Sequence, residues 1–96
     1  MRQTYLQTPG GNPARDQRVD YHAEGELFRS YGKPVAMRVH GEDTVYIDPR
    51  YWDYSQTTTR YLGQYLSDAT TKVNKKIIEQ RLANGEYVFK ELGGVV

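Results

Sequence analysis

Hydroxyl side chains gather in one short segment, Ser55-Gln56-Thr57-Thr58-Thr59-Arg60, where a strand-like stretch gives way to a helix-like one. The start of a helix exposes unpaired backbone N–H groups and partial positive charge, so hydroxyls and an arginine there could hold a phosphate or an acidic side chain. The segment lacks the glycine-rich loop that lets a phosphate approach closely. The alternative is structural, with Ser55 capping the helix and the threonines fastening the preceding loop. Both interpretations stay open at this point.

Catalytic and metal-binding patterns are weak. His22 and His40 are the only candidate histidine bases, nothing places either beside Ser55, and no G-x-S-x-G elbow is present. His22, Glu24 and Glu26 alternate as metal ligands on a strand would, but a glycine interrupts the segment. The absence of cysteine excludes disulfides and thiolate metal sites. We therefore expect no enzyme activity, no metal and no cofactor.

Aromatic side chains crowd the loop that precedes the hydroxyl segment. Tyrosine is abundant in the chain, with nine copies, and it is favoured at binding surfaces because it gives a large contact area and a polar tip. It also suits a small core whose polar ends reach water, and we expect Trp52 to pack against the fold. The predicted partner-binding residues are Tyr51, Trp52, Tyr54, Arg60 and Tyr61.

Lysines supply an alternative site. Lys72, Lys75 and Lys76 share one face of a predicted helix with Glu79, which offsets part of their charge. A solvated face is the ordinary interpretation. The alternative is a nucleic-acid-binding site formed by Arg60 with these three lysines, although the net charge of only +1 gives no general argument for phosphate binding.

Hydrophobic periodicity predicts an α+β fold. Alternating apolar residues indicate three short strands joined by tight turns, followed by two helices and a closing strand. The order β-β-β-α-α-β predicts an antiparallel sheet with both helices packed on one face. In the second helix Ala69, Val73 and Ile77 form the apolar stripe, which Ile78 and Leu82 widen. The expected strands cover 26–31, 35–40, 44–48 and 86–92, and the expected helices cover 55–66 and 67–84.

The first twenty residues carry turn-forming residues and almost no apolar period, so we expect a flexible N-terminal arm over 1–20 and a single domain over 21–96. A short tail is expected after residue 92. The sequence has no apolar run long enough to span a membrane and no apolar signal core, which favours a cytoplasmic protein. An exposed sheet edge or helix face would gain from pairing, so a homodimer is an alternative assembly.

Three short motifs resemble a small domain family of unknown function from bacteriophages and mobile elements. They are Ser30-Tyr31-Gly32-Lys33-Pro34-Val35-Ala36, then Val45-Tyr46-Ile47, then Tyr54-Ser55-Gln56-Thr57-Thr58. The resemblance covers roughly residues 26–66 and implies a phage-encoded accessory protein acting in the host cytoplasm, with no catalytic residues assigned. We expect stoichiometric binding that inhibits or modulates a host protein or protein–nucleic-acid complex, an anti-CRISPR-like anti-defence role being one form of it. The alternative is a nucleic-acid-binding accessory protein.

Overall fold

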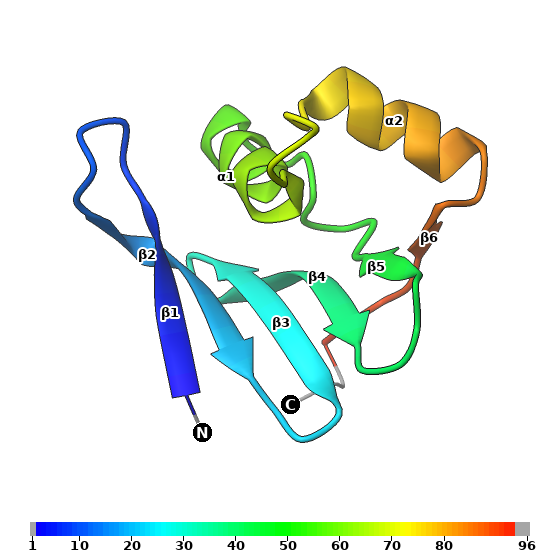
Figure 1. Cartoon of the computed structure of the whole chain (residues 1–96), viewed down its shortest axis with the longest axis horizontal. Coiled ribbons are helices and arrows are strands. Elements are labelled where there is room, and N and C mark those ends of the chain that lie inside the picture. Colours follow the sequence, from blue (N-terminus) through cyan, green and yellow to red (C-terminus); the bar gives the residue numbers. More distant parts are fainter. Residues whose placement is uncertain (1, 94–96) are drawn as a thin grey trace.

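Six strands lie side by side in chain order in the computed structural model, which describes residues 2–93 (Figure 1). The strands are β1 (Arg2–Gln7), β2 (Pro13–Tyr21), β3 (Gly25–Ser30), β4 (Lys33–Val39), β5 (Val45–Ile47) and β6 (Tyr87–Phe89), and the helices are α1 (Gln56–Leu66) and α2 (Lys75–Ala83). Neighbouring strands from β1 to β5 are antiparallel. β6 pairs with β5 in parallel, because the chain passes through both helices before it returns to the sheet.

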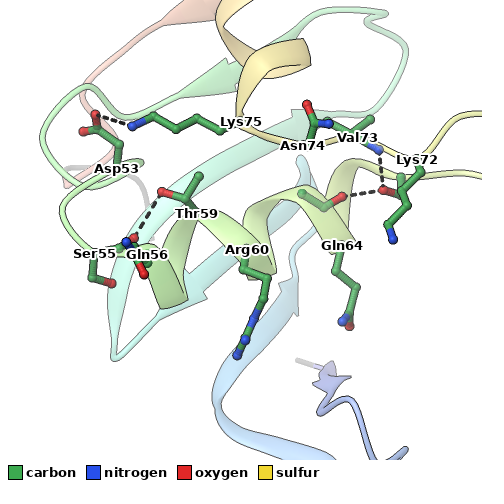
Figure 2. Close-up of a pocket in the computed structure, with 12 residues that line it drawn as sticks. Asp53, Ser55, Gln56, Thr59, Arg60, Gln64, Lys72, Val73, Asn74 and Lys75 are labelled. Atoms are coloured by element: carbon green, nitrogen blue, oxygen red, sulfur yellow. Dashed lines mark hydrogen bonds and ion pairs between the residues drawn. The ribbon is translucent and has the colours of Figure 1, made fainter.

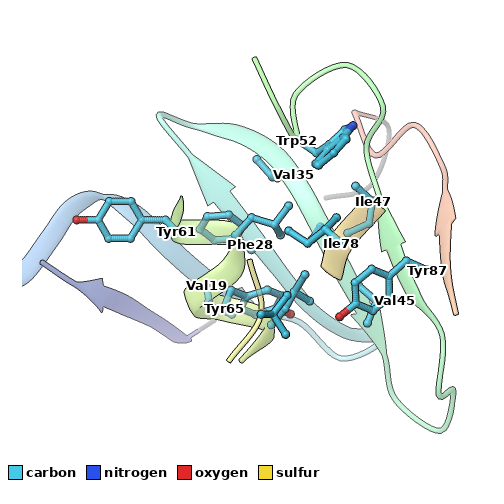
Figure 3. Close-up of a cluster of buried hydrophobic side chains, with 14 of the residues drawn as sticks. Val19, Phe28, Val35, Val45, Ile47, Trp52, Tyr61, Tyr65, Ile78 and Tyr87 are labelled. Carbon is cyan, nitrogen blue, oxygen red and sulfur yellow. The ribbon is translucent and has the colours of Figure 1, made fainter. Parts of the chain in front are cut away.

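Both helices cover the same face of this sheet, as predicted. The main core lies between the helices and the sheet (Figure 3). A row of apolar side chains crosses the sheet in register, and α1 presents its apolar stripe to it. Phe28 and Tyr65 stack there with ring centroids 5.4 Å apart. The row consists of Val19, Phe28, Ala36 and Ile47, and the stripe of Tyr61, Leu62, Tyr65 and Leu66. The predicted α+β architecture is confirmed.

A smaller apolar cluster occupies the opposite face of the sheet. Leu27, Met37 and Leu92 are buried together, so the segment after β6 covers the middle of this face. Asp48, which follows β5 and is fully buried, anchors that segment by accepting a hydrogen bond from the Leu92 backbone N–H at 2.8 Å. The same carboxylate accepts from the Arg50 guanidinium at 3.0 Å, which balances its buried charge.

The predicted flexible arm over 1–20 is instead part of the sheet. Residues 2–7 form β1 and residues 13–21 form β2, joined by the turn-rich segment that the sequence showed. The apolar pattern did not predict β1, because this edge strand has almost all of its side chains exposed and so shows no alternation. Gln17 occupies an inward position of β2, which breaks the alternation there. Met1 of the expected arm and residues 94–96 of the expected tail lie outside the described residues.

The second helix begins eight residues later than predicted. Residues 67–74 are not helical, because Asp68 accepts hydrogen bonds from the backbone N–H groups of Thr70 and Thr71 and so forms a turn. Asn74 then caps α2 by accepting from the Ile77 backbone N–H. The expected stripe therefore changes: Ala69 is exposed in the loop and Ile77 is only half-buried.

Candidate binding surface

The hydroxyl segment forms an internal hydrogen-bond network. Ser55 caps α1 by accepting from the Thr58 backbone N–H at 3.1 Å, and its hydroxyl donates to that of Thr58. The Thr58 hydroxyl also lies 2.8 Å from the hydroxyl of Ser30 at the end of β3, with both side chains buried. Thr59 donates to the backbone carbonyls of Trp52 and Ser55. These hydroxyls therefore cap α1 and fasten it to the sheet and the preceding loop, which is the structural interpretation of the segment.

Two of the five predicted partner-binding side chains are buried. Trp52 is 8% exposed and joins the main core (Figure 3). Its ring centroid lies 6.5 Å from that of exposed Phe89. Tyr61 is 5% exposed because it points inward from α1. Both residues belong to the core, so little of either side chain is exposed to a partner.

The other aromatic residues of the loop lie outside the core. Tyr54 is 48% exposed, and its ring meets that of half-buried Tyr51 edge-on at 6.1 Å. Cations flank Tyr51, with the Arg50 guanidinium 5.0 Å and the Lys33 ammonium 5.8 Å from the ring centroid. The Lys33 contact places the turn between β3 and β4 beside this loop.

That turn carries an exposed tyrosine that sequence analysis did not select. Tyr31 and Gly32 both have positive φ, at 52° and 79°, and form the two-residue turn between Ser30 and Lys33. A turn of this kind prefers asparagine or glycine at its first central position, but here that position is a tyrosine. The Tyr31 ring is 51% exposed. The signal was present, since a Tyr-Gly pair separates two strand-like runs. We call Tyr31, Tyr51 and Tyr54 the tyrosine surface.

A groove of about 650 Å³ lies between α1 and the segment that leads into α2 (Figure 2). The two walls meet at Gly63, where an added Cβ would lie 2.5 Å from the Val73 carbonyl oxygen. Ser67 fastens the walls by donating to the Gly63 carbonyl and accepting from the Val73 backbone N–H. Backbone contact and the two Ser67 hydrogen bonds therefore join the walls at the floor of the groove.

Three cationic side chains line this groove, whose exposed lining is otherwise mostly apolar. Arg60 extends from α1, Lys72 from the loop and Lys75 from the start of α2, against the single carboxylate of Asp53. Lys75 and Asp53 form a marginal pair at 4.0 Å with both side chains about half exposed. The structure thus brings Arg60, Lys72 and Lys75 of the predicted nucleic-acid site together, whereas Lys76 does not line the groove.

Polar groups elsewhere do not assemble a metal site. Among residues 2–93 no three His, Cys, Asp or Glu side chains lie close enough to hold a metal ion together.

Burial and a hydrogen bond to Glu26 raise the pKa of Tyr65 far above its ordinary value, so this hydroxyl stays protonated. No helix in the described part of the chain is long and apolar enough to cross a membrane.

The fold and these surfaces define a small α+β domain with exposed tyrosines beside a cationic groove. The chain belongs to a family of unknown function, DUF8033, whose model matches residues 7–80. That span contains β2 to β5, both helix starts, the tyrosine surface and the whole groove. No curated protein and no solved structure matches the chain.

Proposed function

We propose that the protein acts by stoichiometric binding to a protein partner, through the tyrosine surface. The observation that carries this proposal is the strained turn at Tyr31. A left-handed backbone costs a non-glycine residue roughly 1–2 kcal/mol, and an exposed ring recovers little of that by packing. Strain of this kind concentrates at functional sites, where the surrounding structure holds it in place.

Hydrogen bonds of the residues next to Tyr31 and Tyr54 favour a preformed contact surface. Ser30 precedes Tyr31 and Ser55 follows Tyr54, and both serine hydroxyls meet the hydroxyl of Thr58. The two exposed rings therefore project from backbone segments that one hydroxyl network joins, buried at Ser30 and half-buried at Ser55. Rigid aromatic side chains lose little conformational entropy on binding, which makes them efficient anchors at an interface.

The finer role is also a proposal. Inhibition or redirection of a host protein by a phage-encoded partner, with an anti-CRISPR-like anti-defence role as one form, is consistent with a small domain that offers a contact surface. The likeness of residues 26–66 to phage and mobile-element domains motivates this role. This role is tested by co-expressing the protein with a host defence system during phage infection. Restored phage growth with the wild-type protein, and loss of that effect with Tyr54→Ala, would support the role.

Nucleic-acid binding is the second candidate function, favoured by the grouping of Arg60, Lys72 and Lys75. Two features count against it. No aromatic side chain lines the groove, so bases would find no stacking partner there. Lys76 does not line the groove, which leaves three cationic residues along it for a phosphate backbone to follow.

The test of the proposed function is capture of partners from lysate of the cells that carry the gene, in parallel samples with and without nuclease treatment. Tyr54→Ala should reduce capture at least about tenfold, the loss of an interface anchor, while circular dichroism stays unchanged. Tyr5→Ala is the matched control, because Tyr5 is a similarly exposed tyrosine on β1. Equal capture by wild type and Tyr54→Ala, or loss of all capture with nuclease, would contradict the proposal.

A further inference from the structure

We infer that the groove between α1 and residues 72–75 binds an acidic peptide segment of the partner. The inference rests on the proposed function, since Tyr54 of the tyrosine surface lies between the groove residues Asp53 and Ser55. Tyr54 is thus one residue along the chain from two groove-lining positions, although its own side chain does not line the groove.

Charge is the first argument for an acidic occupant. The groove collects three cationic side chains and one carboxylate, whereas the whole chain has a net charge of only +1. The groove side chains thus carry a formal net charge of +2, and the other residues of the chain together carry −1. Among residues 2–93, Arg60 and Lys72 form no ion pair, so their charges remain available to an incoming carboxylate.

Hydrogen-bonding groups along the groove favour a peptide over a nucleic acid. Asn74 uses its side-chain oxygen to cap α2, and its NH₂ group has no partner within residues 2–93. The Gln56 amide, also on the groove, has none in that part of the chain either. Amides of this kind can pair with the backbone of an extended peptide, while the absence of an aromatic lining removes the stacking that single-stranded nucleic acids use.

The shape of the groove gives a third argument. Contact between Gly63 and the Val73 carbonyl brings the walls together, and Ser67 locks them there. The site is therefore formed before any ligand arrives, which lowers the ordering cost of binding a flexible segment. At about 650 Å³ the groove is large enough for several side chains of a short peptide.

The experiment is a titration of ¹⁵N-labelled protein, followed by NMR. The probes are a short glutamate-rich peptide, the same peptide with every glutamate replaced by glutamine, and a single-stranded oligonucleotide. We expect the glutamate peptide to shift the side-chain NH₂ signals of Gln56 and Asn74 and the backbone signals of 72–75. The glutamine peptide should leave these signals in place.

Matched charge reversals complete the test. Arg60→Glu combined with Lys72→Glu should weaken binding of the glutamate peptide by about tenfold or more, because both charges flank the groove. Lys76→Glu should weaken binding distinctly less than this double variant, since it reverses one charge and that side chain does not line the groove. Absence of groove shifts, equal loss in Lys76→Glu, or tighter binding of the oligonucleotide would overturn the inference.

The two proposals fail separately. If the glutamate peptide does not bind but Tyr54→Ala still abolishes partner capture, the acidic-segment inference is wrong and protein binding through the tyrosine surface stands. If the peptide binds in the groove while the tyrosine variants capture partners normally, the tyrosine surface is the part that is wrong.

Discussion

Ser30 and Thr58 lie 28 positions apart in sequence, yet their hydroxyl oxygens are 2.8 Å apart and both side chains are fully buried. This contact joins the end of β3 to the first turn of α1. It also links the two sequence motifs, one around Tyr31 and one around Tyr54, whose exposed rings form the tyrosine surface.

Breaking that pair should destabilise the fold. Thr58→Val keeps the side-chain shape but leaves the Ser30 hydroxyl buried without its partner, so we expect a loss of about 1–3 kcal/mol in the free energy of unfolding. Adding Ser30→Ala should restore part of that loss, because the fully buried hydroxyl is then no longer stranded, whereas the Ser55 hydroxyl, which also loses its acceptor, is only half-buried. Urea unfolding of both single variants and the double variant measures the coupling. Purely additive losses would show that the two hydroxyls do not interact.

Tyr31 should trade stability for binding. Tyr31→Asn places a residue suited to a positive φ in the turn, so we expect the free energy of unfolding to rise by about 1 kcal/mol. Partner capture should fall in the same variant, because the exposed ring is lost. Thermal unfolding and capture are measured side by side. A destabilised Tyr31→Asn would mean that the ring packs on the fold, and unchanged capture would remove Tyr31 from the binding surface.

Gly63 should tolerate no side chain. Replacing glycine by alanine inside a helix normally stabilises it by about 1 kcal/mol. Here the new methyl group would lie 2.5 Å from the Val73 carbonyl oxygen, and we expect Gly63→Ala to destabilise the protein by about 1–3 kcal/mol. Gly10→Ala is the control, since its nearest neighbours are side-chain atoms 3.7 Å or more away. A stabilised Gly63→Ala would contradict the close approach at the groove floor.

Asp48 should make the fold sensitive to acid. Burial alone would raise the pKa of this carboxyl, but hydrogen bonds from Arg50 and from the Leu92 backbone outweigh it and hold the pKa below the ordinary 3.8. The folded state therefore binds fewer protons than the unfolded state. The resulting stabilisation is present above the unfolded pKa and disappears as the pH falls through the folded one.

Unfolding free energies measured from neutral pH down to acid test this point. The wild type should lose stability as the pH drops below about 4, the range set by the ordinary carboxyl pKa. Asp48→Asn should be less stable at neutral pH, because Arg50 loses its ionic partner, but should show a shallower acid slope. Identical slopes in both proteins would mean that another carboxyl governs the acid response.

Truncation to alanine should cost different amounts of stability at two neighbouring isoleucines. Ile78 is fully buried and Ile77 only half-buried. We expect Ile78→Ala to cost about 2–5 kcal/mol and Ile77→Ala distinctly less, because the cavity term applies only where the surroundings are closed. Chemical denaturation of both variants is the measurement. Equal costs would mean that α2 packs at a different rotation.

Hydrophobic periodicity predicted the helices and strands that have one buried and one exposed face. It did not predict elements whose two faces are equally exposed. The strands around Phe28, Val35 and Ile47 and the apolar stripe of α1 follow from alternation and helical spacing. β1 has nearly every side chain exposed, so its sequence carries no alternation to detect. The late start of α2 depends on a turn made by Asp68, which competes locally with the helix.

The candidate site was only partly predictable for a related reason. Sequence analysis selected Tyr54 and Arg60, which are exposed, but also Trp52 and Tyr61, which the fold buries. An aromatic residue carries the same local signal in both settings. The grouping of Arg60 with Lys72 and Lys75 depends on how two segments pack, and the strain at Tyr31 depends on a backbone angle.

The most direct test of partner binding is photo-crosslinking from the tyrosine surface. A photoreactive phenylalanine derivative is placed at position 54 in one protein and, as the matched control, at position 5 in another. After nuclease treatment and illumination in lysate, position 54 should yield a discrete crosslinked protein band that position 5 does not, and unlabelled wild-type protein should compete it away. Identical band patterns from both positions, or none from position 54, would contradict the account.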